Sequence, residues 1–202
     1  MSVWQTRIRD FSAFIQASDY DARGAAETTW QNPGFRQTEN DPVVCVNWSE
    51  AQAFCDWLTK KERSEKKIEP AQGYRLPTEE EWRRMVGTTL YPWAMTGRLR
   101  AQREITPEEN EIRNRRFRMI DLDIPRRLAR LPQISSAFTT FRGNVWEWCA
   151  DWYSPEQKSR VLRGGSCTTM DAVKIRSAFR LEGKADERDN NNGFRVVLSF
   201  LD

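Results

Sequence analysis

Three tryptophans lie within seven residues of one segment, at positions 146, 148 and 152, and this spacing constrains the fold more than any other feature. Trp146 and Trp148 are separated by one residue, and a period of two is typical of a half-buried strand rather than a helix. Residues 160–163 and 194–198 also have the composition of strands; the second is rich in β-branched residues and follows a turn-prone Asn-Gly. We expect these last two strands to lie side by side.

The segment between those strands, residues 167–193, shows little regular apolar periodicity. It is polar and chemically varied, and rigid strands commonly carry such segments at the surface as binding loops. The sequence therefore predicts a site in this segment, although it does not point to a reaction.

The chain is rich in aromatic residues although it is otherwise polar. Its 202 residues include nine Trp, ten Phe and four Tyr, while 30% are charged. Each aromatic side chain removes a large area from water, so these residues can fill a core where regular secondary structure is scarce. The length fits one domain over residues 1–202, with an insertion or replacement at about 94–140.

Charge and histidine content exclude several function classes. The formal net charge is only +3, which does not argue for nucleic acid as a partner. Histidine is absent, which removes the commonest general base and the commonest transition-metal ligand.

The four cysteines show neither a CxxC motif nor zinc-type spacing. Cys55 and Cys149 lie within apolar patterns and are expected to be buried thiols, and a disulfide framework is not expected. No apolar run is long enough to span a membrane, and residues 1–10 lack the apolar core of a signal peptide. A cytoplasmic or otherwise soluble protein is the expectation.

The first half of the chain predicts three helices and a strand. Residues 4–17 have apolar side chains at helical spacing. Residues 42–46 read as a short strand, followed by a helix capped by Asn47 or Ser49. Thr78 and Glu81 form a second capping box, which opens a short helix.

Residues 94–140 differ in character, with ten Arg between positions 98 and 130. Residues 106–121 predict a helix, because Pro107 suits the first helical position and Glu109 the third. Acidic residues are interleaved with the arginines, which favours a solvated face over a contact with nucleic acid or an acidic partner.

Seven segments, in this order along the chain, carry a family resemblance. They are Asn32-Pro-Gly-Phe-Arg-Gln37, Pro42-Val-Val-Cys-Val-Asn-Trp48 with Ala53-Phe-Cys-Asp-Trp-Leu58, Tyr74-Arg-Leu-Pro-Thr-Glu-Glu-Glu-Trp82, Tyr91-Pro-Trp93, Gly143-Asn-Val-Trp-Glu-Trp148, Arg160-Val-Leu-Arg-Gly-Gly-Ser166 and Asn192-Gly-Phe-Arg195. Together they resemble the formylglycine-generating-enzyme/sulfatase-modifying-factor domain family. The resemblance covers about residues 11–93 and 141–198. It implies an α+β fold of the C-type-lectin type, with short twisted antiparallel sheets, few helices and many ordered loops.

The resemblance also implies where catalytic residues would stand. Oxidases of this family hold copper(I) with two Cys, three and eight residues after the Ser of the Gly-Gly-Ser motif. Thr169 and Lys174 occupy those positions here, and neither supplies a thiolate. The related sulfoxide synthases use iron held by three His, which a chain without His cannot provide. We therefore expect no catalytic residues and no cofactor, while a formylglycine-generating-type oxidoreductase, or an enzyme acting in some other mode, is kept as the alternative.

The family's calcium site is not expected either. Much of it comes from the segment that residues 94–140 replace here. Asn144 and Glu147 are the remaining candidate ligands, and we interpret them as a turn residue and a paired surface carboxylate.

The closing motifs, Arg-Gly-Gly-Ser and Asn-Asn-Asn-Gly-Phe-Arg, are also similar to those of variable proteins of diversity-generating retroelements. That resemblance makes Arg176, Ser177, Arg180, Asp186 and Arg188 framework residues. It makes eleven positions exposed and changeable: Cys167, Thr168, Thr169, Met170, Lys174, Phe179, Leu181, Glu182, Gly183, Lys184 and Glu187. A mixture of apolar and charged side chains suits an adaptable recognition surface. The first hypothesis is thus a non-catalytic module that binds a protein or glycan through residues 167–187.

Overall fold

The computed structural model describes residues 1–2, 4–18, 20–22, 28–87, 144–169, 171, 173–174 and 176–200. The Tyr-Pro-Trp motif at 91–93, the Arg-rich stretch at 94–140 with its expected helix, and Gly143 and Met170 lie outside these residues. None of the helices within the described ranges is long and apolar enough to cross a membrane.

Helix α1 (Ile8–Ser18) begins later than the sequence predicts. Ser2 and Thr6 lie before the helix and pair with the C-terminal segment: the Ser2 amide donates to the Val196 carbonyl and the Thr6 amide to the Phe194 carbonyl. This pairing joins the N-terminal segment to residues 194–196.

Helix α2 (Trp48–Ser64) begins at a complete capping box. The Asn47 side chain accepts from the Glu50 amide, and the Glu50 carboxylate accepts from the Asn47 amide, each at 2.8 Å. Of the two predicted caps, Asn47 is therefore correct and Ser49 is wrong. Helix α3 (Glu79–Val86) begins at the predicted box of Thr78 and Glu81.

The expected strand at 42–46 does not form. Cys45 has a φ of +57°, in the left-handed region, which is incompatible with an extended strand. Only one bridge, between Arg7 and Pro42, remains in this segment. The Val43 and Cys45 amides instead donate to the carbonyls of Thr6 and Asp189, so the segment still ties distant parts of the chain together.

The larger sheet contains four strands in the order β4-β3-β2-β5. They are β2 (Trp146–Trp152), β3 (Ser159–Arg163), β4 (Leu181–Lys184) and β5 (Asn192–Gly193). The β2–β3 and β3–β4 pairs are antiparallel, whereas β5 runs parallel to β2. The two strands expected at 146–152 and 160–163 are confirmed, and β4, which lies within the segment expected to be irregular, was not predicted.

A separate antiparallel pair joins β1 (Gln72–Arg75) to β6 (Val197–Phe200). The expectation that 160–163 and 194–198 lie side by side is wrong, because β3 and β6 belong to different sheets. Residues 194–196 instead pair with the N-terminal segment, and the chain then continues into β6 alongside β1.

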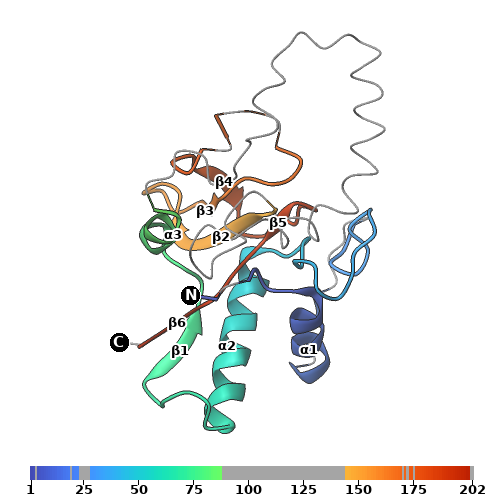
Figure 1. Cartoon of the computed structure of the whole chain (residues 1–202), viewed down its shortest axis with the longest axis vertical. Coiled ribbons are helices and arrows are strands. Elements are labelled where there is room, and N and C mark those ends of the chain that lie inside the picture. Colours follow the sequence, from blue (N-terminus) through green and yellow to red (C-terminus); the bar gives the residue numbers. More distant parts are fainter. Residues whose placement is uncertain are drawn as a thin grey trace, which may run out of the picture.

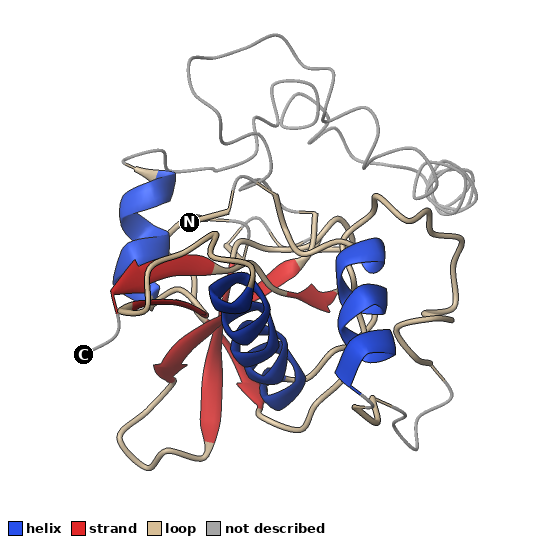
Figure 2. Cartoon of the chain, turned by 90° about the horizontal axis from the view of Figure 1, so that it is seen from below, coloured by secondary structure: helices blue, strands red, loops and turns tan. Residues whose placement is uncertain are grey.

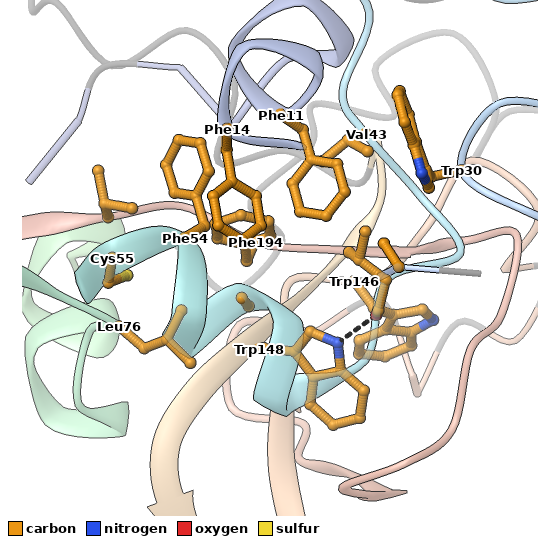
Figure 3. Packing of buried hydrophobic residues seen from close by; sticks show 14 of the residues in the cluster. Phe11, Phe14, Trp30, Val43, Phe54, Cys55, Leu76, Trp146, Trp148 and Phe194 are labelled. Carbon is orange, nitrogen blue, oxygen red and sulfur yellow. Dashed lines mark hydrogen bonds between the residues drawn. The ribbon is translucent and has the colours of Figure 1, made fainter. Parts of the chain in front are cut away.

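The core is an aromatic cluster between the helices and the larger sheet (Figure 3). Phe11 and Phe14 of α1, Phe54 of α2 and Phe194 are buried, with neighbouring ring centroids 5.3–6.4 Å apart. Figure 2 shows α1 and α2 against the strands. Burial on this scale explains how a chain with short strands holds together.

Candidate functional site

Strands β2 and β3 form a platform, and the segment at 167–187 is held on it through β4, which pairs with β3 (Figure 1). Trp148 anchors this platform to the segment that precedes α2, because its buried indole Nε1 donates to the Val46 carbonyl at 2.9 Å (Figure 3). Side chains alternate across β4, so Glu182 and Lys184 point outward while Leu181 and Gly183 face Trp148 and the core. The outward side chains of β4 are therefore exposed to solvent, while the strand itself is fixed to the buried core.

The predicted positions fall into two groups by exposure. Thr168, Lys174, Glu182, Lys184 and Glu187 are exposed, whereas Cys167, Thr169, Phe179 and Leu181 are half-buried and Gly183 is buried. Met170 lies outside the described residues.

Gly183 is not a changeable surface position, and that expectation is wrong. A Cβ built on Gly183 would lie 2.6 Å from the Trp148 ring and 2.7 Å from Leu162 Cδ1. Both neighbours are fully buried, so they cannot move aside without repacking the core. Only glycine allows β4 to approach β2 and β3 this closely.

Phe179 and Leu181 are also less exposed than expected, because both pack against the aromatic core. The Phe179 ring centroid lies 6.1 Å from that of Trp146. Apolar side chains in this segment thus contribute to packing as well as to the surface, and the changeable set is smaller than the sequence predicts.

Arg163 holds the loop from beneath. This buried guanidinium donates to three successive carbonyls, those of Ser177 (2.6 Å), Ala178 (3.0 Å) and Phe179 (2.6 Å). Burial lowers the pKa of Arg163. The Glu79 carboxylate, 3.5 Å away, acts in the opposite direction and favours the charged guanidinium. The strand reading of residues 160–163 did not identify this role.

Two further ion pairs fix the segment at either side of β4. Arg180 donates to both carboxylate oxygens of Glu79, at 2.7 and 3.0 Å. Arg188 contacts Glu50, the capping residue of α2, at 2.8 Å, and this hydrogen bond raises the pKa of Arg188. Both arginines therefore occupy the framework positions expected of them, whereas the side chains of Arg176 and Asp186 are exposed.

Arg160 stabilises the outer part of the platform by stacking between two indole rings. Its guanidinium carbon lies 3.7 Å from the ring centroid of Trp48 and 3.3 Å from that of Trp152. Its Nη1 donates to the Ala150 carbonyl at 2.7 Å. Stacking of this kind joins α2, β2 and β3 beneath β4.

The Gly-Gly-Ser turn leads from β3 into the candidate segment. Gly164 and Gly165 have φ values of +101° and +74°, which non-glycine residues rarely adopt. The turn is closed by hydroxyl groups: Ser166 Oγ lies 3.0 Å from Thr168 Oγ1 and 2.9 Å from Thr169 Oγ1, and the Ser166 amide donates to Thr169 Oγ1. Thr169, at the position of the family's first copper-binding Cys, is thus part of a hydroxyl cluster.

The thiols of the chain offer no substitute for the missing pair. Cys45, Cys55 and Cys149 are buried, and burial raises the pKa of each, which favours the protonated thiol. The expectation of buried thiols at Cys55 and Cys149 is confirmed. Cys167 is half-buried and its amide donates to the Asn144 carbonyl. Within the described residues, no cluster of three or more Cys, Asp or Glu side chains could hold a metal ion.

The oxygens of Glu147 are already used by other side chains and do not offer a calcium ligand. Both oxygens of Glu147 accept from Arg195 at 2.7 Å, and they also accept from Gln5 and Trp82. Glu147 is indeed paired, as expected, but it is buried rather than at the surface. A carboxylate enclosed by a guanidinium and two further donors has no free face for a cation.

Comparison with known proteins identifies the family. The model of the sulfatase-modifying factor enzyme 1-like domain matches residues 2–200. The chain is 30% identical over 187 residues to the inactive C-alpha-formylglycine-generating enzyme 2 of Mus musculus, covering 84% of this chain and 54% of the relative. It is 28% identical to the formylglycine-generating enzyme of Streptomyces coelicolor, covering 93% of this chain and 67% of that enzyme. The chain thus spans about half the length of the mouse relative.

Solved structures show the same fold. PvdO from Pseudomonas aeruginosa superposes with a TM-score of 0.64 at 19% identity, covering 99% of this chain and 79% of that one. Treponema denticola variable protein 1 superposes with a TM-score of 0.54 at 21% identity, covering 98% and 82%. The expected α+β fold is confirmed by these matches. The chain belongs to the sulfatase-modifying factor enzyme 1-like domain family.

Proposed function

We propose that this chain is a non-catalytic recognition module that binds a protein or glycan ligand through the exposed part of residues 167–187. The observation that carries this proposal is the separation of surface from support. Loop and strand are held by Arg163, Arg180, Arg188 and Gly183, whereas Thr168, Lys174, Glu182, Lys184 and Glu187 point outward. Exposed side chains contribute less to the fold than these anchoring residues do, so they can change with the ligand while the fold is kept.

The residue types at the family's reactive positions support a binding role. Thr169 donates and accepts hydrogen bonds within the turn, and Lys174 is exposed. A hydroxyl and an ammonium cannot replace two thiolates as ligands of a soft copper(I) ion. One of the relatives named above is itself described as inactive, which agrees with loss of the reaction in part of the family.

Residues 167–187 are further proposed to be diversified, as in variable proteins of retroelements. The fold likeness to Treponema denticola variable protein 1 supports this proposal. Sequencing of the genomic neighbourhood tests it. We expect a near-repeat of the DNA that encodes residues 143–198, differing at adenines, beside a reverse transcriptase gene, and absence of both would contradict the proposal.

A combined replacement tests the recognition surface. Lys174, Lys184 and Glu187 are replaced together by alanine and Thr168 by serine, which keeps the hydroxyl at that position, while Arg163, Arg180, Gly183 and Arg188 are kept. We expect the unfolding free energy to change by less than about 1 kcal/mol, because exposed side chains away from special features contribute little. Binding to a ligand selected from a displayed protein and glycan collection should fall at least about tenfold.

The matched control is Arg163→Met, which removes the guanidinium beneath the loop and leaves the exposed residues in place. It should lower both stability and ligand binding. If the quadruple replacement unfolds the domain, those side chains support the core and the proposed surface is wrong. Unchanged affinity for ligands selected on the original protein would contradict it as well.

A further inference from the structure

A groove lies between the N-terminal segment, α1 and α2, with a cavity volume of about 470 Å³. Its floor includes the buried residues Phe54 and Val196. Trp4 forms one wall although 45% of its surface is exposed, and the half-buried Trp57 and Leu58 form the opposite side. An apolar floor with an exposed indole at its edge is typical of a surface that another molecule covers.

The spacing of residues along α2 explains the shape of the groove. Phe54, Trp57, Leu58 and Lys61 follow the i, i+3, i+4, i+7 pattern and therefore share one face of the helix. On α1, Arg9 and the small exposed residue Ala13 face the same space. The two helices lie side by side at the end of the molecule away from β3 and β4 (Figure 1).

The charges around the groove are unbalanced. Among its lining residues are three cations, Arg7, Arg9 and Lys61, and one carboxylate, Asp10. Arg7 pairs closely with Asp10 at 2.8 Å, whereas Arg9 approaches the same carboxylate only at 4.0 Å. Lys61 contacts Glu65 on its own helix, and both side chains are more than a third exposed. Positive charge therefore borders an apolar floor.

We propose that this groove docks an acidic amphipathic segment of a partner protein. An apolar side chain of that segment packs on Phe54 and Val196 beside Trp4, and its carboxylates face Arg9 and Lys61. Tryptophan and arginine are the residue types enriched among energetically dominant interface positions, and complementary charge at the rim fixes orientation and speeds association.

A second copy of the chain is a poor occupant. A twofold interface brings the same surface patch of both copies together. Two patches that each carry three cations and one carboxylate would then be brought together, and this excess of like charge is unfavourable at close range. The charge pattern thus favours a different, acidic partner.

This groove is distinct from the proposed recognition surface. The beginning of α2 contacts the end of that surface, through the Trp48 amide on the Ala185 carbonyl and through Glu50 on Arg188. Lys61, at the groove, lies thirteen residues further along α2, which corresponds to about 20 Å along the helix axis. A partner in the groove therefore leaves residues 167–187 free.

Selection from a random-peptide display library tests the proposal. The wild-type protein is used as bait, with the Trp4→Ala/Arg9→Glu variant for counter-selection. We expect enriched peptides to combine Asp or Glu with aromatic or aliphatic residues. For synthetic copies of these peptides, fluorescence anisotropy should show that Trp4→Ala, Arg9→Glu and Lys61→Glu each weaken binding at least about tenfold.

Two matched variants control for general effects. Phe200→Ala removes a more exposed aromatic ring outside the groove, and Lys60→Glu reverses a neighbouring exposed charge on α2 that does not line it. Both should leave affinity within about twofold. Enriched peptides without acidic residues, or peptides that bind wild type and double variant equally, would overturn the proposal. So would dimerisation that Trp4→Ala abolishes, or a groove that binds anionic phospholipid vesicles in preference to the peptides.

Discussion

Arg195 and Glu147 form a bidentate ion pair in the protein interior, with Nε and Nη2 of the guanidinium each 2.7 Å from a carboxylate oxygen. The same carboxylate accepts from Gln5 at 2.6 Å and from the Trp82 indole at 2.9 Å. Four segments far apart in sequence thus converge on Glu147. The network joins the N-terminal segment, α3, β2 and the C-terminal segment.

Removal of one partner from this network should strongly destabilise the fold. We expect Arg195→Met to lower the unfolding free energy by about 3–5 kcal/mol, because it leaves a buried carboxylate without its cation. Urea denaturation followed by tryptophan fluorescence measures the change. Arg84→Met is the control: it breaks a pair with Glu80 whose side chains are 75% and 47% exposed, and should cost less than about 1 kcal/mol. Equal losses in the two variants would contradict this account.

The close approach of β4 to Trp148 predicts the effect of a single methyl group. Gly183→Ala should lower stability by about 1–3 kcal/mol, since the added Cβ meets buried ring carbons. Lys184→Ala, which shortens an exposed side chain on the outer face of the same strand, should cost less than about 1 kcal/mol. Thermal denaturation of both variants makes the comparison, and a harmless Gly183→Ala would show that β4 does not pack as described.

Glu81 makes part of the stability pH-dependent. Its hydrogen bonds with Arg75 lower its pKa to about 2. Because the folded pKa is depressed, the stabilisation is present above the unfolded value of about 4.3 and is lost as the pH falls towards 2. We therefore expect wild type to exceed Arg75→Gln in stability at pH 6 by about 1 kcal/mol, because the two side chains are 31% and 34% exposed and solvent partly screens the pair. The difference should shrink between pH 4 and pH 2 in urea denaturation, and a gap that widens on acidification would refute this assignment.

The cysteines should differ in reactivity towards an aromatic disulfide reagent under native conditions. Cys45, Cys55 and Cys149 are buried with raised pKa values, and thiolates are the reactive species. Only Cys167 is half-exposed. We expect one thiol to react quickly and Cys167→Ser to abolish that phase. A fast phase that survives the substitution would show that a buried cysteine is accessible.

Sequence patterns predicted those elements whose formation depends on residues close together in the chain. The capping box at Thr78 and Glu81, the alternation of Trp146 and Trp148, and the buried thiols were readable because each depends on residues near in sequence. Strand β1 and strand β4 are four residues each, and neither has a pattern that distinguishes it from a loop. The left-handed conformation of Cys45 cannot be read from its residue type.

The sequence indicated a candidate segment between strands, but it did not indicate the residues that hold this segment in place. A varied polar segment between rigid strands indicated where to look. The supporting contacts, however, join residues up to 101 positions apart in sequence. They are the hydrogen bond from Arg163 to the Ser177 carbonyl, the ion pair between Arg180 and Glu79, and the packing of Gly183 against Trp148. Gly183 was grouped with surface residues because one sequence does not show what a glycine packs against. The same reason led Glu147 to be placed at the surface.

The most direct test of a recognition role is an assay for the family's oxidation. The protein is loaded with copper(I) under reducing conditions and incubated with a cysteine-containing sulfatase peptide and oxygen, and the peptide is analysed by mass spectrometry. With Thr169 and Lys174 in place of the thiol pair, we predict that the cysteine is recovered unchanged. Conversion of that cysteine to the aldehyde would contradict the account.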